Sequence, residues 1–133
     1  MSEAPDICPA LKYRDAKAAI TLLTEAFGFT ATAVYEGEDG LVAHAELTYG
    51  NGTVMLGSTG TDSVFDKAMG AGGPVGVYVH VRDVDEHHAR AVAHGAEIVM
   101  PPTDQEYGSR DYMAKDAEGN VWSFGTYTPG SAD

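Results

Sequence analysis

The order of hydrophobic and polar residues predicts a strand, a helix and three more strands in the first half of the chain. Residues 7–14 are typical of a strand covered on both faces, because apolar and polar residues do not alternate there. Asp15 fits the N-cap of a helix that ends at Gly28. Short turns containing glycine separate the later strands, which indicates an antiparallel meander. We expect these strands at Thr30–Tyr35, Val42–Thr48 and Thr53–Leu56.

The second half of the chain repeats this pattern, so the sequence predicts two equivalent βαβββ modules. An apolar strand ends on Arg14 and Asp15, and another ends on Arg82 and Asp83, each followed by a helical pattern that stops at a glycine. The second set of strands is expected at Val75–Val81, Glu97–Met100, Arg110–Lys115 and Asn120–Thr126. We therefore expect one domain over residues 1–133, with modules at about 7–58 and 75–127 and a Gly-rich linker at 59–74.

Composition and charge narrow the classes of function. The chain has 133 residues and a formal net charge of −12, which repels phosphate backbones, and no basic patch offsets it. No apolar stretch is long enough to span a membrane and the N-terminus has no signal-peptide pattern. The single cysteine, Cys8, excludes an intramolecular disulfide. We expect a cytoplasmic protein that binds neither nucleic acid nor a membrane.

Two segments of the second half resemble a known superfamily. Residues 116–124 read Asp-Ala-Glu-Gly-Asn-Val-Trp-Ser-Phe, and residues 82–97 read as the helix of a second module. Together with the repeat, they resemble the vicinal oxygen chelate superfamily, which includes glyoxalase I, bleomycin-resistance proteins, fosfomycin-modifying enzymes and extradiol dioxygenases. The resemblance covers about residues 7–127. It implies an α+β fold in which two βαβββ modules form a paired, open-barrel-like antiparallel or mixed sheet with a concave cavity.

The resemblance also implies four metal-ligand positions, one on each of four strands. They fall at Cys8, Glu46, Gly76 and Ser123, and only Glu46 keeps a strong ligand type. A divalent ion in an enzyme of this kind needs about three protein ligands. We therefore predict that metal is absent or weakly bound. A site rebuilt from His44, Glu46 and His80 is the alternative.

Strand alternation, combined with the resemblance, predicts a ligand pocket on the concave face. Two of its residues, Tyr107 and Arg110, lie in a loop similar to loops that border the pocket in metal-free relatives. The alternative for this loop is a plain turn in which Arg110 pairs with a neighbouring carboxylate. By alternation Asp111 also points inward, whereas Trp122 and Phe124 point to the core. The predicted pocket residues on strands are His44, Glu46, Leu56, Tyr78, His80, Met113 and Ser123.

These features favour a small-molecule-binding protein without a metal, holding its ligand in the concave cavity. Two other hypotheses remain open: a metal-dependent lyase, isomerase or dioxygenase of the same superfamily, and a structural or regulatory partner protein. No nucleophile motif or phosphate-binding glycine motif occurs, so no catalytic residue is assigned. Relatives commonly dimerise, and bare strand edges invite pairing, so we expect a homodimer.

Overall fold

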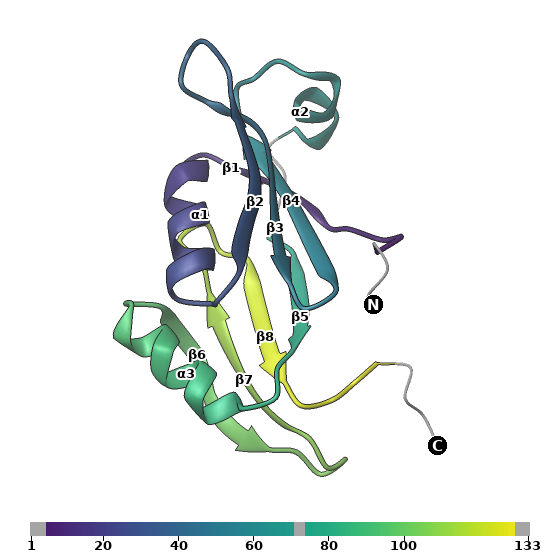
Figure 1. The fold of residues 1–133 in the computed structure, drawn as a ribbon, viewed down its shortest axis with the longest axis vertical. Helices are drawn as coiled ribbons and strands as arrows, with labels where there is room; N and C mark the ends of the chain where they lie inside the picture. The colour runs from purple at the N-terminus through teal and green to yellow at the C-terminus, as the bar shows by residue number, and fades with distance from the viewer. Residues whose placement is uncertain (1–4, 71–73, 130–133) are drawn as a thin grey trace. The chain divides into compact units, whose positions relative to one another are not determined.

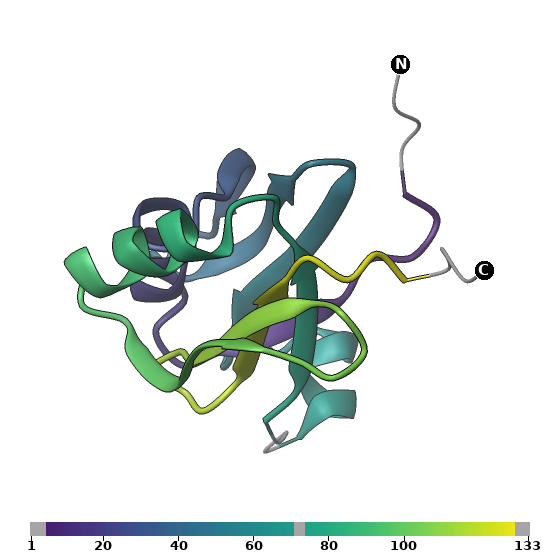
Figure 2. The ribbon, with the colours of Figure 1, turned by 90° about the horizontal axis from the view of Figure 1, so that it is seen from below.

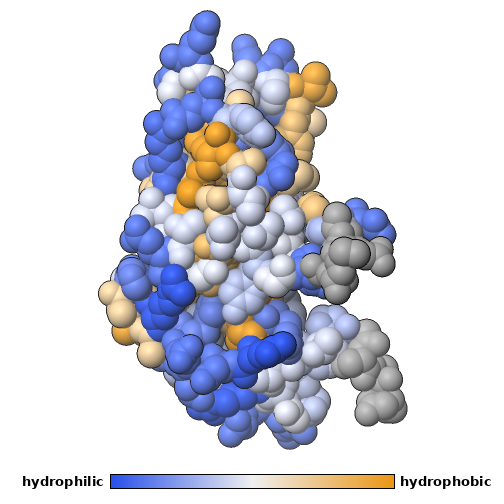
Figure 3. All heavy atoms as spheres, in the orientation of Figure 1, coloured by the Kyte–Doolittle hydropathy of each residue, from blue (hydrophilic) through white to orange (hydrophobic). Residues whose placement is uncertain are grey.

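The computed structural model describes residues 5–70 and 74–129. The chain forms two compact units, Met1–Gly73 and Pro74–Asp133, and each is described by itself. Among the described residues, no helix combines the length and the apolar character needed to cross a membrane. In the view of Figure 3, hydrophilic and intermediate residues predominate and hydrophobic ones form separate small groups, in keeping with the acidic composition.

The first unit is a four-stranded mixed sheet with the strand order β1-β4-β3-β2 (Figure 1). β1 pairs with β4 in parallel, and the other neighbours are antiparallel. A two-residue turn joins β3 to β4, and Tyr49 pairs with Gly52 across it. The strands are β1 (Ala10–Tyr13), β2 (Thr30–Glu36), β3 (Val42–Tyr49) and β4 (Gly52–Ser58).

Helix α1 (Ala16–Glu25) packs against all four strands of this sheet. Asp15 caps it as predicted, since its carboxylate accepts from the Ala18 backbone N–H at 3.0 Å. The helix buries Leu23 completely, and Phe27 after it is equally buried. Gly28 takes a positive φ of 82°, which lets the chain turn back into β2.

The segment expected as a plain linker contains a short helix, α2 (Val64–Met69), which the sequence pattern did not predict. Ser63 accounts for it, because its hydroxyl accepts from the Asp66 backbone N–H at 3.0 Å and so caps the first turn. The helix buries no side chain and therefore shows no hydrophobic period along the chain. The rest of the expected linker includes residues 71–73, which lie outside the described residues.

The second unit repeats the architecture of the first, which confirms the repeat inferred from the sequence (Figure 2). Its strand order, β5-β8-β7-β6, corresponds one to one with that of the first unit. Helix α3 (Val84–Ala93) takes the place of α1 and packs on β6 and β7. The strands are β5 (Gly76–His80), β6 (Glu97–Asp104), β7 (Arg110–Lys115) and β8 (Val121–Gly125).

β6 runs four residues beyond its predicted end at Met100 and includes Pro101 and Pro102. Proline lacks the N–H that a central strand needs, so the sequence pattern ends at these residues. β6 is an edge strand that pairs only with β7 in its sheet, and its register shifts between Met100 and Thr103. An irregular edge accommodates both prolines.

The turn before β8 is organised by Asp116, which is 4% exposed. Its carboxylate accepts from the backbone N–H of Asn120 at 3.0 Å and from the indole N–H of Trp122 at 3.1 Å. Gly119 supplies the positive φ of 91° that the turn requires. Trp122 and Phe124 are fully buried, as predicted for core residues. The motif that carries the resemblance is therefore a fold-determining turn.

A polar cluster on Asp111 as the candidate functional site

Each sheet has one face packed against α1 or α3 and a second face turned away from that helix, here called the far face. Side chains alternate between the two faces along a strand, and residues paired across strands share a face. The strand registers therefore decide which predicted pocket residues lie together within each unit.

In the first unit, the far face carries His44 and Glu46. The His44 Nε2 and Glu46 Oε2 atoms are 2.9 Å apart, and the two side chains are 42% and 43% exposed. Tyr35 stacks on the His44 ring, with centroids 6.2 Å apart. The Glu46 carboxylate is therefore half exposed and has His44 as its partner.

Lys12 shares the far face of the first unit but contacts a different carboxylate. Its Nζ lies 2.8 Å from Asp66 Oδ1 and donates to the Ser58 carbonyl at 2.7 Å. The Phe65 ring lies 5.8 Å from the same Nζ. The hydrogen bond from Lys12 lowers the pKa of Asp66 below its ordinary value. These contacts attach α2 to β1.

Leu56 does not share a face with Glu46, contrary to the prediction. Leu56 pairs with Ala45, and both are buried beneath α1, whereas Glu46 pairs with Met55. The physical reason is the tight turn that pairs Tyr49 with Gly52, because it fixes which residues of β4 face α1. Met55 is the residue of β4 that lies beside Glu46.

In the second unit, two rows of cross-strand partners form the far face. One row runs Met100, Met113, Ser123 and Tyr78, and the other runs Thr103, Asp111, Gly125 and His80. The predicted pocket residues Tyr78, His80, Met113 and Ser123 thus lie on one face of one sheet.

Asp111 is the centre of a polar cluster on this face and is 8% exposed. The Ser109 hydroxyl donates to Asp111 Oδ1 at 2.7 Å, and the Tyr107 hydroxyl donates to Oδ2 at 3.3 Å. The Tyr78 hydroxyl donates to the Tyr127 carbonyl at 2.6 Å. We call these five residues the Asp111 cluster. Tyr78 and Tyr107 were predicted site residues, whereas Ser109 and Tyr127 carry no sequence signal that marks them.

Gly125 allows the cluster to form. A Cβ atom at this position would lie 3.0 Å from both the Asp111 Oδ1 and the Tyr78 Oη atoms, closer than real Cβ contacts normally come. Burial raises the pKa of Tyr78, and the negative charge of Asp111 adds to this effect.

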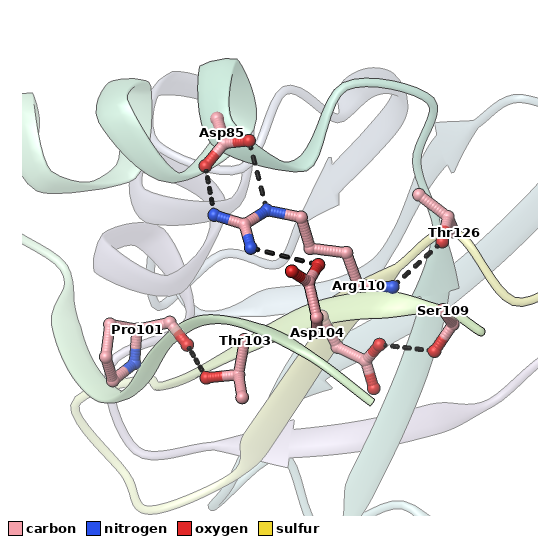
Figure 4. Close-up of polar contacts among 8 residues, drawn as sticks. Asp85, Pro101, Thr103, Asp104, Ser109, Arg110 and Thr126 are labelled. Carbon is pink, nitrogen blue, oxygen red and sulfur yellow. Dashed lines mark hydrogen bonds and ion pairs between the residues drawn. The ribbon is translucent and has the colours of Figure 1, made fainter. Parts of the chain in front are cut away.

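Arg110 does not belong to this face, which decides between the two interpretations of its loop. Its guanidinium makes two hydrogen bonds to Asp85 on α3, at 2.9 and 3.1 Å, and a third to Asp104 at 3.1 Å (Figure 4). These bonds raise the pKa of Arg110 and lower that of Asp85. Arg110 is one residue from Asp111 on the same strand, so it points to the helix side, and its assignment to the pocket is wrong.

The donor set does not fit the metal that the resemblance implies. Cys8 lies before β1, which begins at Ala10. Gly76 pairs with Val121, and the residue that pairs with Ser123 is Tyr78. Glu46 has Met55 as its far-face partner on β4. Over residues 5–70 and 74–129, no three His, Cys, Asp or Glu side chains are grouped to hold a metal ion.

Comparisons with known proteins agree with the resemblance. The sequence model of the Glyoxalase/Bleomycin resistance protein/Dioxygenase superfamily matches residues 9–124. The chain belongs to this superfamily. Uncharacterised proteins of Mycobacterium bovis and Mycobacterium tuberculosis are 34% identical over 126 residues, which is 91% of this chain and 82% or 74% of theirs.

Two solved structures share the fold of this chain. TioX from Micromonospora sp. ML1 is 35% identical with a TM-score of 0.79, and the match covers 94% of this chain and all of that one. A glyoxalase I variant from Zea mays has a TM-score of 0.70 at 19% identity, covering 90% of this chain and 43% of that one. At this lower identity, the likeness shows the fold alone.

Proposed function

We propose that this protein binds a small organic molecule noncovalently and without a metal ion. The observation that carries the proposal is the Asp111 cluster, which groups a buried carboxylate, on the sheet face that α3 does not cover, with Tyr78 and with two tyrosines from the segments beside the strands. The core of the unit lies on the other face, around Trp122 and Phe124. A set of polar groups beside aromatic walls is typical of a small-ligand site.

Superfamily membership supports this proposal at the level of the fold, and the donor set supports binding without a metal. Glu46 has one potential ligand beside it, His44, and over residues 5–70 and 74–129 no three His, Cys, Asp or Glu side chains are grouped, whereas a metal centre of this kind needs about three protein ligands. The His44–Glu46 pair is a second polar group available to a ligand, on the far face of the first unit.

A thermal-melt screen tests the proposal. The panel contains aromatic compounds in three charge classes: cationic, neutral and anionic. We expect at least one class to raise the Tm in a saturable way, since a ligand at about 100 times its Kd stabilises a protein by about 2.7 kcal/mol. Asp111→Asn should reduce that rise, whereas Glu38→Gln, which changes an exposed carboxylate, should leave it unchanged. No Tm change with any class would contradict the proposal.

A further inference from the structure

The Asp111 carboxylate has hydrogen-bond donors but no positive charge beside it. Its two hydrogen bonds come from the neutral hydroxyls of Ser109 and Tyr107, and within the described residues no Lys, Arg or His pairs with it. A carboxylate can accept about four hydrogen bonds, so part of its capacity stays unused. A buried carboxylate gains most from a cation, because the surrounding dielectric is low.

Three tyrosines belong to the Asp111 cluster, and two pairs of their rings meet at steep angles. Tyr127 meets Tyr78 at 63° with centroids 6.4 Å apart, and it meets Tyr107 at 86° with centroids 6.3 Å apart. Tyr107 is 68% exposed and Tyr127 48% exposed, so a ligand can reach both side chains. The negative face of an aromatic ring attracts cations, and quaternary ammonium groups are commonly bound between such rings.

The remaining contacts hold the Tyr78 ring in place. Its hydroxyl is committed to the Tyr127 carbonyl, and Gly125 leaves the space that the hydroxyl and the carboxylate share. Asp111 is the only acidic side chain of the cluster, since the other four members carry hydroxyl groups.

From these observations we infer that the Asp111 cluster binds the alkylammonium group of a small organic cation. Asp111 neutralises the charge, and the rings of Tyr78, Tyr107 and Tyr127 contact the alkyl groups. The inference rests on the proposed small-molecule binding and adds the chemical class of the ligand. The net charge of −12 favours the approach of cations over anions.

Calorimetric titration of the full-length protein with choline tests this inference. The comparison compound is dimethylbutanol, the uncharged carbon isostere of choline, which has the same shape without the positive charge. We expect saturable binding of choline, at least about tenfold tighter than that of dimethylbutanol, and weaker at high salt. Equal binding of the two compounds would overturn the inference.

Two variants assign the binding to the cluster. Asp111→Asn keeps the shape and removes the charge, and we expect it to weaken choline binding about tenfold. Tyr107→Leu changes an exposed ring and is expected to weaken binding severalfold without unfolding the protein. Phe65→Leu is the matched control, since Phe65 is a 44% exposed ring of the first unit that belongs to neither polar group, and this variant should bind choline like the wild type. Wild-type binding in Asp111→Asn or Tyr107→Leu would overturn the inference.

Two further titrations separate the possible failures. If a neutral or anionic aromatic compound binds and choline does not, the cation inference fails and the proposed function stands. If no compound binds, both fail. A peptide carrying trimethyllysine presents the same ammonium group as part of a protein. Tighter binding of that peptide than of choline would contradict the inference that the ligand is a small molecule.

Discussion

At the scale of single residues, two carboxylates illustrate how burial decides a role. Asp116 is 4% exposed and accepts hydrogen bonds from two backbone N–H groups, the Asn120 amide and the Trp122 indole. Glu46 is 43% exposed and contacts one imidazole. The first carboxylate fixes the turn before β8, and the second lies on a surface available to a ligand.

Replacement of Asp116 should therefore destabilise the fold strongly. Asp116→Ala leaves buried donors of Asn120 and Trp122 without an acceptor, and we expect a loss of roughly 2–4 kcal/mol in the free energy of unfolding. Urea denaturation followed by the fluorescence of Trp122, the only tryptophan, measures this loss. A loss below about 1 kcal/mol would mean that the turn does not depend on the carboxylate.

Replacement of Glu46 provides the contrast. The pair with His44 is half exposed, and pairs of this kind contribute about 0–1 kcal/mol. Glu46→Gln should be close to neutral, and Glu46→Ala should cost less than about 1 kcal/mol by the same urea titration. A larger cost would show that Glu46 is a structural residue, and it would no longer count as available to a ligand.

At the scale of elements, the sequence predicts where periodic hydrophobic residues exist and fails where local hydrogen bonds dominate. α1 buries an apolar stripe, and α3 buries Val84, His87 and Ala91 at helical spacing, so their positions could be predicted. α2 buries nothing and depends on the Ser63 cap and on Asp66, which leave no periodic signal. The two-residue turn before β4 sets the register between β3 and β4 and so decides which sheet face Leu56 lies on. Alternation within a strand does not give this register.

The Lys12–Asp66 contact gives α2 a pH dependence that can be measured. The pKa of Asp66 is lowered from 3.8 by the Lys12 hydrogen bond, so the stabilisation is present above pH 3.8 and is lost as the pH falls through the lower folded value. Asp66→Asn should lower the Tm at neutral pH, and its difference from the wild type should shrink below pH 3.8.

A neighbouring variant controls for the loop itself. Asp62 has a positive φ of 66°, which asparagine also tolerates, so Asp62→Asn should change the Tm little at any pH. An equal Tm loss for Asp62→Asn and Asp66→Asn would contradict the role given to the Lys12 contact.

At the scale of the whole molecule, the sequence predicted the superfamily and the duplicated βαβββ succession of elements, but only part of the site. The repeat and the turn at residues 116–120 could be predicted, because a comparison of the two halves of the sequence reveals both. The Asp111 cluster depends on Tyr127, which approaches Tyr78 only through the folded strand ends, whereas Ser109 lies two residues from Asp111 along the chain. Arg110 was misassigned because sequence does not show that Asp85 lies within its reach.

We predict a homodimer, because each sheet has edge strands that could pair with a second chain. β2 is the edge of its sheet, is largely exposed and pairs on one side only, with β3. Such an edge can accept a second strand. Light scattering at tens of micromolar protein should give the mass of two chains, and a mass of one chain would contradict the prediction.

Native mass spectrometry combined with elemental analysis tests the central claim most directly. The protein is dialysed against a chelator and then titrated with choline and with the aromatic panel. We expect one organic molecule bound per chain and no stoichiometric zinc, nickel, manganese or iron. One equivalent of such a metal that survives dialysis, together with no bound organic molecule, would contradict binding without a metal.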